Sequence, residues 1–359
     1  MTRDAATAST RTGATAAPAH PSKQSSRRPQ AMLWTGLGIV YVVWGSTYLA
    51  IRIAVETMPP FLSAALRFLV AGLLLTGIVA WRFGPAALKI DARRLATVVM
   101  VGLLLLVGGN GLVVLAETHL PSGLAALLVA SVPLWVIVLR TLFGDRPRAA
   151  TFAGVLLGFC GLAVLTLPGS SGSVRLTGIV LVLAASMLWS LGSFASSRLP
   201  MPANPFTASS YEMLAGGLGD LALGLFRHEH LHLGAVSTSS WLALAYLVVF
   251  GSIVAFSAFA WLLQNAPLSL VATYAYVNPV VAVALGWLIL SEPVTWSIAL
   301  GGAVVVAGVF LVVSTEARTK QAPVPEDEGP QQEKPKQPKQ KQRRQQQPQP
   351  AQRSPEQHR

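Results

Sequence analysis

Long apolar segments alternate with short polar stretches over most of the chain. Each apolar segment spans roughly 20 residues, which is enough for a helix to cross ~30 Å of hydrocarbon. The connections are short, are punctuated by Gly and Pro, and leave no room for a soluble domain. The pattern predicts an all-α integral membrane protein with ten transmembrane helices, which begin near Met32, Pro60, Leu95, Ser122, Thr151, Leu176, Phe206, Trp241, Leu268 and Trp296.

The second half of the chain repeats the first at an offset of 145 to 147 residues. Each repeat holds five spans, an odd number, so the second repeat must enter the membrane from the opposite side. We therefore predict two inverted repeats, 32–168 and 174–314, an architecture that places transporter sites near the midplane at the repeat interface. The matched pairs are Trp44 and Trp189, Pro60 and Pro205, Pro121 and Pro267, Pro133 and Pro279, Gly154 and Gly301, and Gly161 and Gly308.

Two polar tails flank the repeats. Residues 1–31 hold five Lys or Arg and one acid, and residues 315–359 hold ten and six, so eight of the twelve net positive charges lie outside the repeats. The charge therefore gives no indication of nucleic-acid binding. Both tails are predicted to be disordered, because the second is rich in Gln, Pro and Lys and has almost no apolar residues. It is either simply solvated or in contact with anionic lipid headgroups.

Basic residues in the loops predict the orientation of the chain. Loops of one parity carry most of them, and by the positive-inside rule these loops face the cytoplasm. We expect a multi-pass protein of the cell membrane with both termini in the cytoplasm. The basic residues of this parity are Arg82, Lys89, Arg93, Arg94, Arg140, Arg146, Arg148 and Arg198, whereas the other parity has only Arg175 and Arg227.

Several sequence runs resemble the EamA family of the drug/metabolite transporter superfamily. They include YVVWGSTYLAIR at 41–52, SGLAALLVASVP at 122–133 and VNPVVAV at 277–283, and the likeness extends over residues 35–314. It implies ten helices in two EamA repeats, cytoplasmic termini, and export or exchange of small metabolites such as amino acids. In one departure, Asp145 and Arg146 stand where the second repeat has Ser291 and Glu292, so the acidic cap of the family is only approximately kept there.

Aromatic residues line one face of the first predicted helix. Tyr41, Trp44, Tyr48 and Arg52 are spaced i, i+3, i+7 and i+11, which places them on the same side. This face forms either a stacking wall for an amphipathic or cationic substrate, or a packing surface with an anchor at the membrane interface.

A row of serine hydroxyls runs along the sixth predicted helix, next to Trp189. Ser186, Ser190, Ser193 and Ser197 recur at helical spacing. They line water or substrate, or they are the small residues that membrane helices use where they cross.

Other polar residues interrupt the third and ninth spans. Asn110, Tyr274 and Asn278 are candidates for substrate contacts, and Pro133 and Pro279 interrupt backbone pairing. The freed carbonyls either bind substrate or are satisfied by neighbouring helices.

Three charged residues fall inside apolar spans, where charge usually marks function. Arg67 matches Glu212 at an offset of 145, so the inverted repeats place them at mirrored depths. Asp220 lies eight residues further along and reaches about the depth of Arg67. We predict that Arg67 pairs with Asp220 and leaves Glu212 free to bind a cationic group or a proton. The alternative is that Arg67 and Glu212 extend to opposite interfaces.

Other function classes are disfavoured. No intramembrane Ser–His dyad, HExxH motif or phosphate-binding G-x-x-x-x-G-K-[ST] loop is present, so neither an enzyme nor an ATP-driven pump is expected. The single cysteine excludes an intrachain disulfide. We predict a secondary transporter without cofactor or metal, whose partners are a small-molecule substrate and the lipid bilayer. The alternative is a membrane sensor, receptor or scaffold. The glycine-rich fifth and tenth spans either form a homodimer or pack internally.

Overall fold

The computed structural model describes residues 27–144, 147–165, 175–266 and 273–321, which form helices without a β-strand. The first repeat contains α1 (Arg27–Ile39), η1 (Val40–Trp44), α2 (Gly45–Ala54), α3 (Pro60–Phe83), η2 (Pro85–Leu88), α4 (Ala92–Gly102), η3 (Leu103–Gly111), α5 (Leu112–Ala116), α6 (Ser122–Val129), α7 (Val132–Leu142) and α8 (Ala149–Leu165). The second contains α9 (Leu176–Arg198), α10 (Pro205–Phe226), η4 (Leu233–Ala235), α11 (Thr238–Tyr246), η5 (Leu247–Val254), α12 (Ala255–Asn265), α14 (Tyr274–Leu290) and α15 (Trp296–Gln321).

These elements account for the ten predicted transmembrane helices. Seven continuous helical segments are long and apolar enough to cross a membrane, and Ala149–Leu165 and Val277–Leu290 are shorter apolar helices. The tenth is α10, which has 22 residues and carries Glu212 and Asp220. The first, third, fourth and eighth spans each combine two or three of the elements named above.

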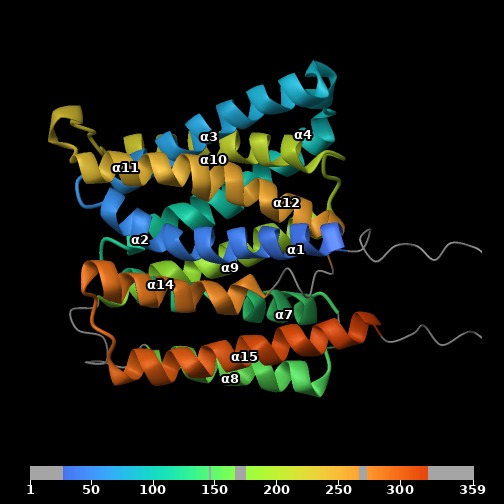
Figure 1. The fold of residues 1–359 in the computed structure, drawn as a ribbon, viewed down its shortest axis with the longest axis vertical. Helices are drawn as coiled ribbons and strands as arrows, with labels where there is room; N and C mark the ends of the chain where they lie inside the picture. The colour runs from blue at the N-terminus through green and yellow to red at the C-terminus, as the bar shows by residue number, and fades with distance from the viewer. Residues whose placement is uncertain (1–26, 145–146, 166–174, 267–272, 322–359) are drawn as a thin grey trace, which may run out of the picture. The chain divides into compact units, whose positions relative to one another are not determined.

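Helices at matched positions in the two repeats pack against each other. The second spans, α3 and α10, lie side by side (Figure 1). The fourth spans are also in contact, through α6 and α14. Figure 1 also shows the start of α1 and the end of α15 at the same end of the bundle. This pairing is the arrangement that two inverted five-helix repeats predict.

The glycine-rich faces of α8 and α15 are in contact within one chain. A Cβ on Gly308 would lie 2.5 Å from the backbone nitrogen of Gly158, and a Cβ on Gly161 would lie 2.6 Å from that of Val305. Small residues allow membrane helices to approach this closely. Of the two uses predicted for these glycines, the structure therefore shows internal packing. A homodimer stays a prediction, and it would have to use other surfaces than these glycine-rich faces.

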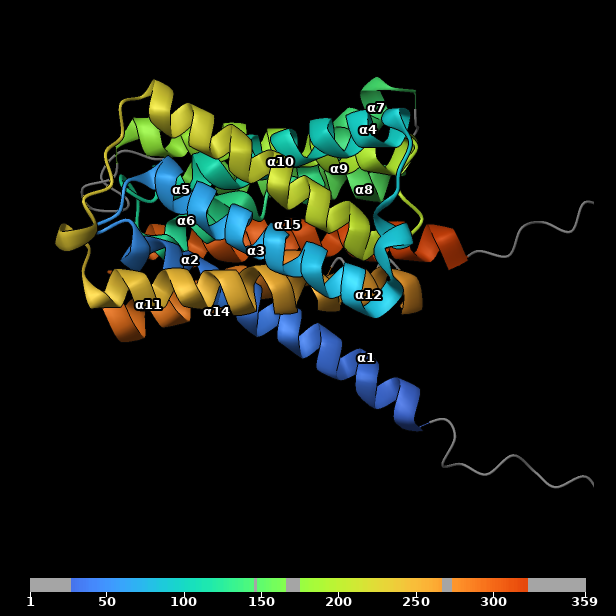
Figure 2. The ribbon, with the colours of Figure 1, turned by 90° about the horizontal axis from the view of Figure 1, so that it is seen from above.

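The ends of the repeats differ slightly from the predicted boundaries. α1 begins at Arg27 and α15 continues to Gln321, so a few residues assigned to the tails are helical, because Glu, Ala, Arg and Lys favour helix. Figure 2 shows α1 diverging from the other helices. A small buried cluster of Leu37 in α1, Val40 in η1 and Leu262 in α12 connects this part of the chain to α12. The remaining tail residues, Pro267, Asp145 and Arg146 lie outside the described residues.

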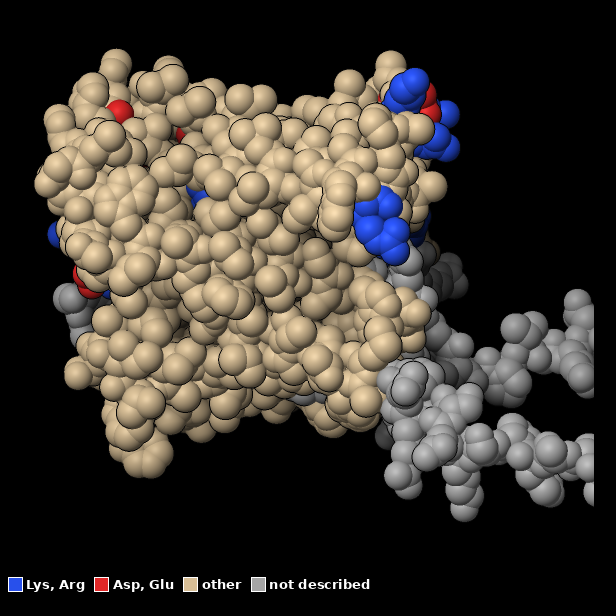
Figure 3. Space-filling model, turned by 45° about the horizontal axis from the view of Figure 1, so that its top comes forward, with Lys and Arg blue, Asp and Glu red and all other residues tan. Residues whose placement is uncertain are grey.

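Charged side chains gather at the ends of the helices. Figure 3 shows a broad face of other residues, with Lys and Arg concentrated at one end. There α4 begins after Asp91, whose Oδ1 accepts from the backbone N of Arg94 at 2.8 Å. This hydrogen bond at the start of the helix holds the pKa of Asp91 below its ordinary value, and so keeps the capping carboxylate charged.

The hydrophobic core contains two large clusters of buried side chains, and each cluster includes residues of both repeats. One contains residues of α6, α7, α8, α9, α14 and α15. The other contains residues of α2, α3, α5, α10 and α11. Helices from both clusters also line the cavity described next.

Candidate functional site

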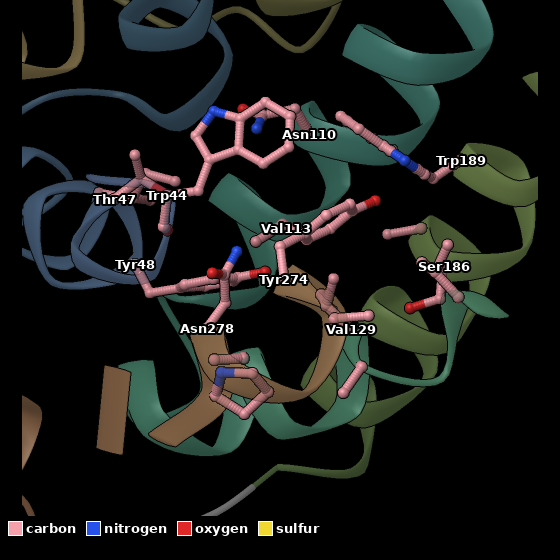
Figure 4. Close-up of a pocket in the computed structure, with 18 of the residues that line it drawn as sticks. Trp44, Thr47, Tyr48, Asn110, Val113, Val129, Ser186, Trp189, Tyr274 and Asn278 are labelled. Carbon is pink, nitrogen blue, oxygen red and sulfur yellow. The ribbon is translucent and has the colours of Figure 1, made fainter. Parts of the chain in front are cut away.

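A cavity of about 100 Å³ lies among helices of both repeats. Seven of the ten predicted site residues line it, and Figure 4 shows most of them around the central space. The seven are Trp44, Tyr48, Arg67, Asn110, Trp189, Tyr274 and Asn278.

Three π-helical segments lie in or next to this cavity. They are η1, η3 and η5, and the π conformation is rare and often found at functional sites. Trp44 of η1 and Gly109 and Asn110 of η3 line the cavity. η5 occupies the place in the second repeat that η3 has in the first, and it contacts the lining residues Trp44 and Arg67 through Gly251 and Ser252.

Arg67 connects the two matched π segments. Its Nε donates to Ser252 Oγ of η5 at 3.0 Å, and its Nη1 donates to Asn110 Oδ1 of η3 at 3.4 Å. The side chain is only 3% exposed. Arg67 therefore does not extend to the membrane interface but lies buried between the repeats, with donors left over for a further acceptor.

Aromatic rings form the walls of the cavity. Trp44 contacts Phe256 edge-on with ring centroids 5.4 Å apart, Phe259 at 4.9 Å and Tyr274 at 5.3 Å. Its Nε1 donates to the carbonyl oxygen of Gly251 in η5 at 3.3 Å. Trp44 thus has a packing role and also lines the cavity (Figure 4). Stacking of Trp44 against a substrate stays a prediction.

Few polar side chains line the cavity. Arg67 is the one charged side chain among the described residues that line it. Asn278 is 7% exposed, and its Oδ1 has no hydrogen-bond partner among the described residues. The cavity therefore offers a guanidinium and a free amide oxygen within aromatic walls.

Serines of α9 lie against the break in the fourth span. α6 ends at Val129 and α7 begins at Val132, next to Pro133. Ser190 Oγ is within hydrogen-bond distance of the carbonyl oxygen of Val132, at 3.0 Å, and of that of Ser186 in its own helix, at 2.7 Å. Ser186 Oγ lies 3.5 Å from the carbonyl oxygen of Leu128, which also accepts from Ser131 Oγ at 2.7 Å. The hydroxyl of Ser190 therefore links α9 to the broken helix.

Replacement of Ser190 by Ala is expected to destabilise the protein by about 1 kcal/mol, because the buried carbonyl of Val132 loses its donor. Ser193→Ala is the matched control on the same helix. The free energy of unfolding in mixed micelles checks the difference, and equal values for the two variants would contradict the bracing role of Ser190.

Three predicted site residues lie outside the cavity. Ser193 is half-buried, and its carbonyl oxygen accepts from Ser196 Oγ at 2.9 Å. Glu212 is also half-buried, at a place where a Cβ on Gly102 would lie 2.6 Å from its carbonyl oxygen. Asp220 is fully buried. The sequence analysis estimated only how deep Glu212 and Asp220 lie in the membrane. Whether a side chain reaches the cavity also depends on which face of its helix the neighbouring helices enclose.

The predicted ion pair between Arg67 and Asp220 is not formed. Both oxygens of Asp220 are buried without a hydrogen-bond partner among the described residues, whereas Arg67 donates to the neutral residues Ser252 and Asn110. The charges of Arg67 and Asp220 still act on each other. The prediction was correct about proximity and wrong about the bond.

Two residues near Arg67 were not predicted as part of the site. Ser252 is 185 residues away from Arg67 in the sequence, and nothing in the pattern singles out one serine of the eighth span. Glu117 follows α5 and is fully buried, with neither carboxyl oxygen partnered among the described residues. In the sequence, Glu117 stands at the end of an apolar span, where a residue of a solvated loop is expected. Only its burial in the structure indicates that it belongs near the site.

Known proteins resemble this chain over most of its length. The model of the EamA-like transporter family matches residues 32–167 and 176–314. The inner membrane transporter YedA of Escherichia coli K12 is 40% identical over 255 residues, which cover 71% of this chain and 81% of YedA. The transporter YvbV of Bacillus subtilis is 26% identical over 313 residues, which cover 85% of this chain and 98% of YvbV.

A plant protein resembles this chain in sequence, and a solved structure resembles it in fold. A WAT1-related chloroplastic protein of Arabidopsis thaliana is 27% identical over 288 residues, which cover 78% of this chain and 69% of that protein. A protein crystal structure aligns with a TM-score of 0.57 at 22% identity and covers 81% of this chain and 98% of its own. Two repeats of helices around a shared cavity, each matched by the same family model, establish that the chain belongs to the EamA-like transporter family.

Proposed function

We propose that this protein carries small zwitterionic metabolites, such as amino acids with apolar or aromatic side chains, across the cell membrane by alternating access. The observation that carries this proposal is the cavity at the repeat interface, with one guanidinium and one free amide oxygen inside aromatic walls. Binding sites for small molecules typically combine apolar walls with a few placed polar groups.

The two polar groups complement the two ends of an amino acid. The Arg67 guanidinium has unused donors and favours a carboxylate, for which its fork geometry is suited. The Asn278 Oδ1 accepts a hydrogen bond from an ammonium group, and the rings of Trp44, Trp189 and Tyr274 attract both cations and apolar side chains. An amphipathic zwitterion would use all of these groups at once.

A purely cationic substrate fits less well. The one charged side chain among the described lining residues is positive, and a like charge in a low-dielectric cavity is repelled. Of the two substrate classes that the sequence predicted, the cavity therefore favours amino acids over cationic amphiphiles.

The fold supports alternating access, and we assign no catalytic role to the chain. Matched helices from the inverted repeats pack against each other, and α3, α6 and α14 also line the cavity, an arrangement in which one repeat can rock against the other. The basic loops favour cytoplasmic termini. Export, which the family resemblance implies, stays a prediction.

Counterflow in proteoliposomes tests the substrate class. Vesicles preloaded with an unlabelled mixture of the standard L-amino acids should accumulate the radiolabelled mixture, and tetraethylammonium should neither accumulate nor compete. Accumulation of tetraethylammonium alone would contradict the proposed class. Amino-acid binding without any flux would instead support a sensor or receptor.

A further inference from the structure

Asp220 is a fully buried carboxyl group that the proposed transport cycle has not yet used. It lies on α10 and is 0% exposed. Its Oδ1 would be 2.6 Å from a Cβ on Gly111, beside the ring of Phe61. Gly111 is the last residue of η3 and directly follows Asn110, the partner of Arg67. Asp220 therefore packs against η3, the segment whose Asn110 accepts a hydrogen bond from Arg67.

Few charged groups act on this carboxyl. They are Arg67 of α3 and Glu229 in the loop after α10. Glu229 Oε2 accepts from the backbone N of Leu62 at 3.0 Å, so it is engaged near the start of α3. Of the other elements packed against α10, η3 and α12 contain no titratable side chain, and α4 has only Arg93 and Arg94 in its first turn.

An ionised carboxylate in this position would be costly. A buried charge without hydrogen bonds is destabilising by several kcal/mol, and such a group usually becomes neutral instead. The alternative is a direct pair with Arg67. The bond from Arg67 to Asn110 is long, 3.4 Å, and contributes little. The bond from Arg67 to Ser252, at 3.0 Å, has a neutral acceptor, so an ionised Asp220 would compete with both partners for the guanidinium.

We propose that Asp220 is the proton-binding residue of this transporter, and that its protonation keeps Arg67 available to the carboxylate of the substrate. The inference rests on the proposed function for the substrate and on the burial of Asp220 for the proton. It takes the place of Glu212, which the sequence favoured for this role, because Asp220 is fully buried and lies against Gly111 of η3, whereas Glu212 is half-buried.

The two states of Asp220 have opposite effects on the cavity. When Asp220 holds a proton taken from water, Arg67 keeps its neutral partners and its remaining donors bind a carboxylate. When Asp220 releases that proton, the carboxylate draws Arg67 away from the cavity and competes with the substrate. Proton and substrate therefore bind together, and because linkage is reciprocal the substrate also strengthens proton binding.

Infrared spectroscopy of the full-length protein tests proton occupancy without any substrate. At neutral pH, the wild type should show the carbonyl-stretching band of a protonated carboxylic acid. Asp220→Asn should weaken this band, to which the fully buried Glu117 also contributes, and the matched control Glu212→Gln should leave it at its wild-type strength. An unchanged band in Asp220→Asn would overturn the proposal. The melting temperature of Asp220→Asn should equal or exceed that of the wild type, because Asn is nearly isosteric with the neutral acid.

Transport supplies an independent readout. Counterflow of the radiolabelled amino-acid mixture should fall as pH rises in the wild type and in Glu212→Gln, whereas Asp220→Asn should keep its acidic-pH flux over the whole range. A wild-type pH profile in Asp220→Asn would overturn the proposal. Absence of flux in the wild type would contradict the proposed function, and the infrared result would still decide the protonation of Asp220.

Discussion

Replacement of Arg67 by Gln is expected to reduce amino-acid counterflow roughly ten- to a hundredfold. The guanidinium is the one charged group among the described residues that line the cavity, and a hydrogen bond to a charged partner contributes about 1.5 to 3 kcal/mol. Gln keeps a polar side chain near Ser252 and Asn110, so the loss should reflect the missing charge and not collapse of the site. Initial rates of counterflow per reconstituted protein measure the effect.

Two further variants separate charge from geometry. Arg67→Lys keeps a positive charge but cannot reach Ser252 and Asn110 with one planar fork, so it should retain only part of the flux. Arg82→Gln, at the exposed end of α3, should transport as the wild type does. Wild-type flux in Arg67→Gln would show that the substrate does not need the guanidinium and would contradict the proposed binding mode.

The fold follows largely from the sequence because its main determinants are local. Apolar length sets the number of spans, and the matched prolines and glycines reveal the repeat. The span that α10 forms was also predicted from its apolar length, and the match of Pro205 with Pro60 supports its place as the second span of its repeat. The π turns of η1, η3 and η5 were not predicted, since a change of one residue per turn leaves the hydrophobic pattern unaltered.

Site residues can be predicted from the sequence where the residue type alone is unusual in an apolar span. They cannot be predicted where only contacts with other helices distinguish one residue from others of its type. Large aromatic and amide side chains inside apolar spans are rare, and Trp44, Trp189, Asn110 and Asn278 all reach the cavity. Serines are common, so Ser252 could not be distinguished from Ser193 before the packing was known.

Depth and direction must be distinguished for the charged residues. Counting residues from each proline predicted that Arg67 and Asp220 lie at similar depth, and their charges do act on each other. The same count placed Glu212 at a mirrored depth but gave no information about the face of α10 on which it lies. Rotation about a helix axis depends on neighbouring helices, which a single sequence does not specify.

Replacement of Gly109 by Ala is expected to reduce transport about five- to a hundredfold. Gly109 lines the cavity on η3, and a Cβ there would lie 2.7 Å from Cε3 of Trp189. An indole ring is rigid, so the added methyl must displace the whole ring into a cavity of about 100 Å³. Overpacking of this kind costs about 1 to 3 kcal/mol, and here the cost falls on the bound state. The measurement is the concentration dependence of counterflow, in which the apparent affinity should weaken.

The neighbouring glycine supplies the control for this effect. A Cβ on Gly108 would lie 2.9 Å from Cδ1 and 3.1 Å from Cβ of Leu188, so this leucine must shift, but Leu188 does not line the cavity. Gly108→Ala has the same helix propensity gain and the same added volume, but it does not line the cavity. It should therefore keep most of the wild-type affinity. Equal losses in the two variants would mean that the π turn itself, and not the space beside Trp189, limits transport.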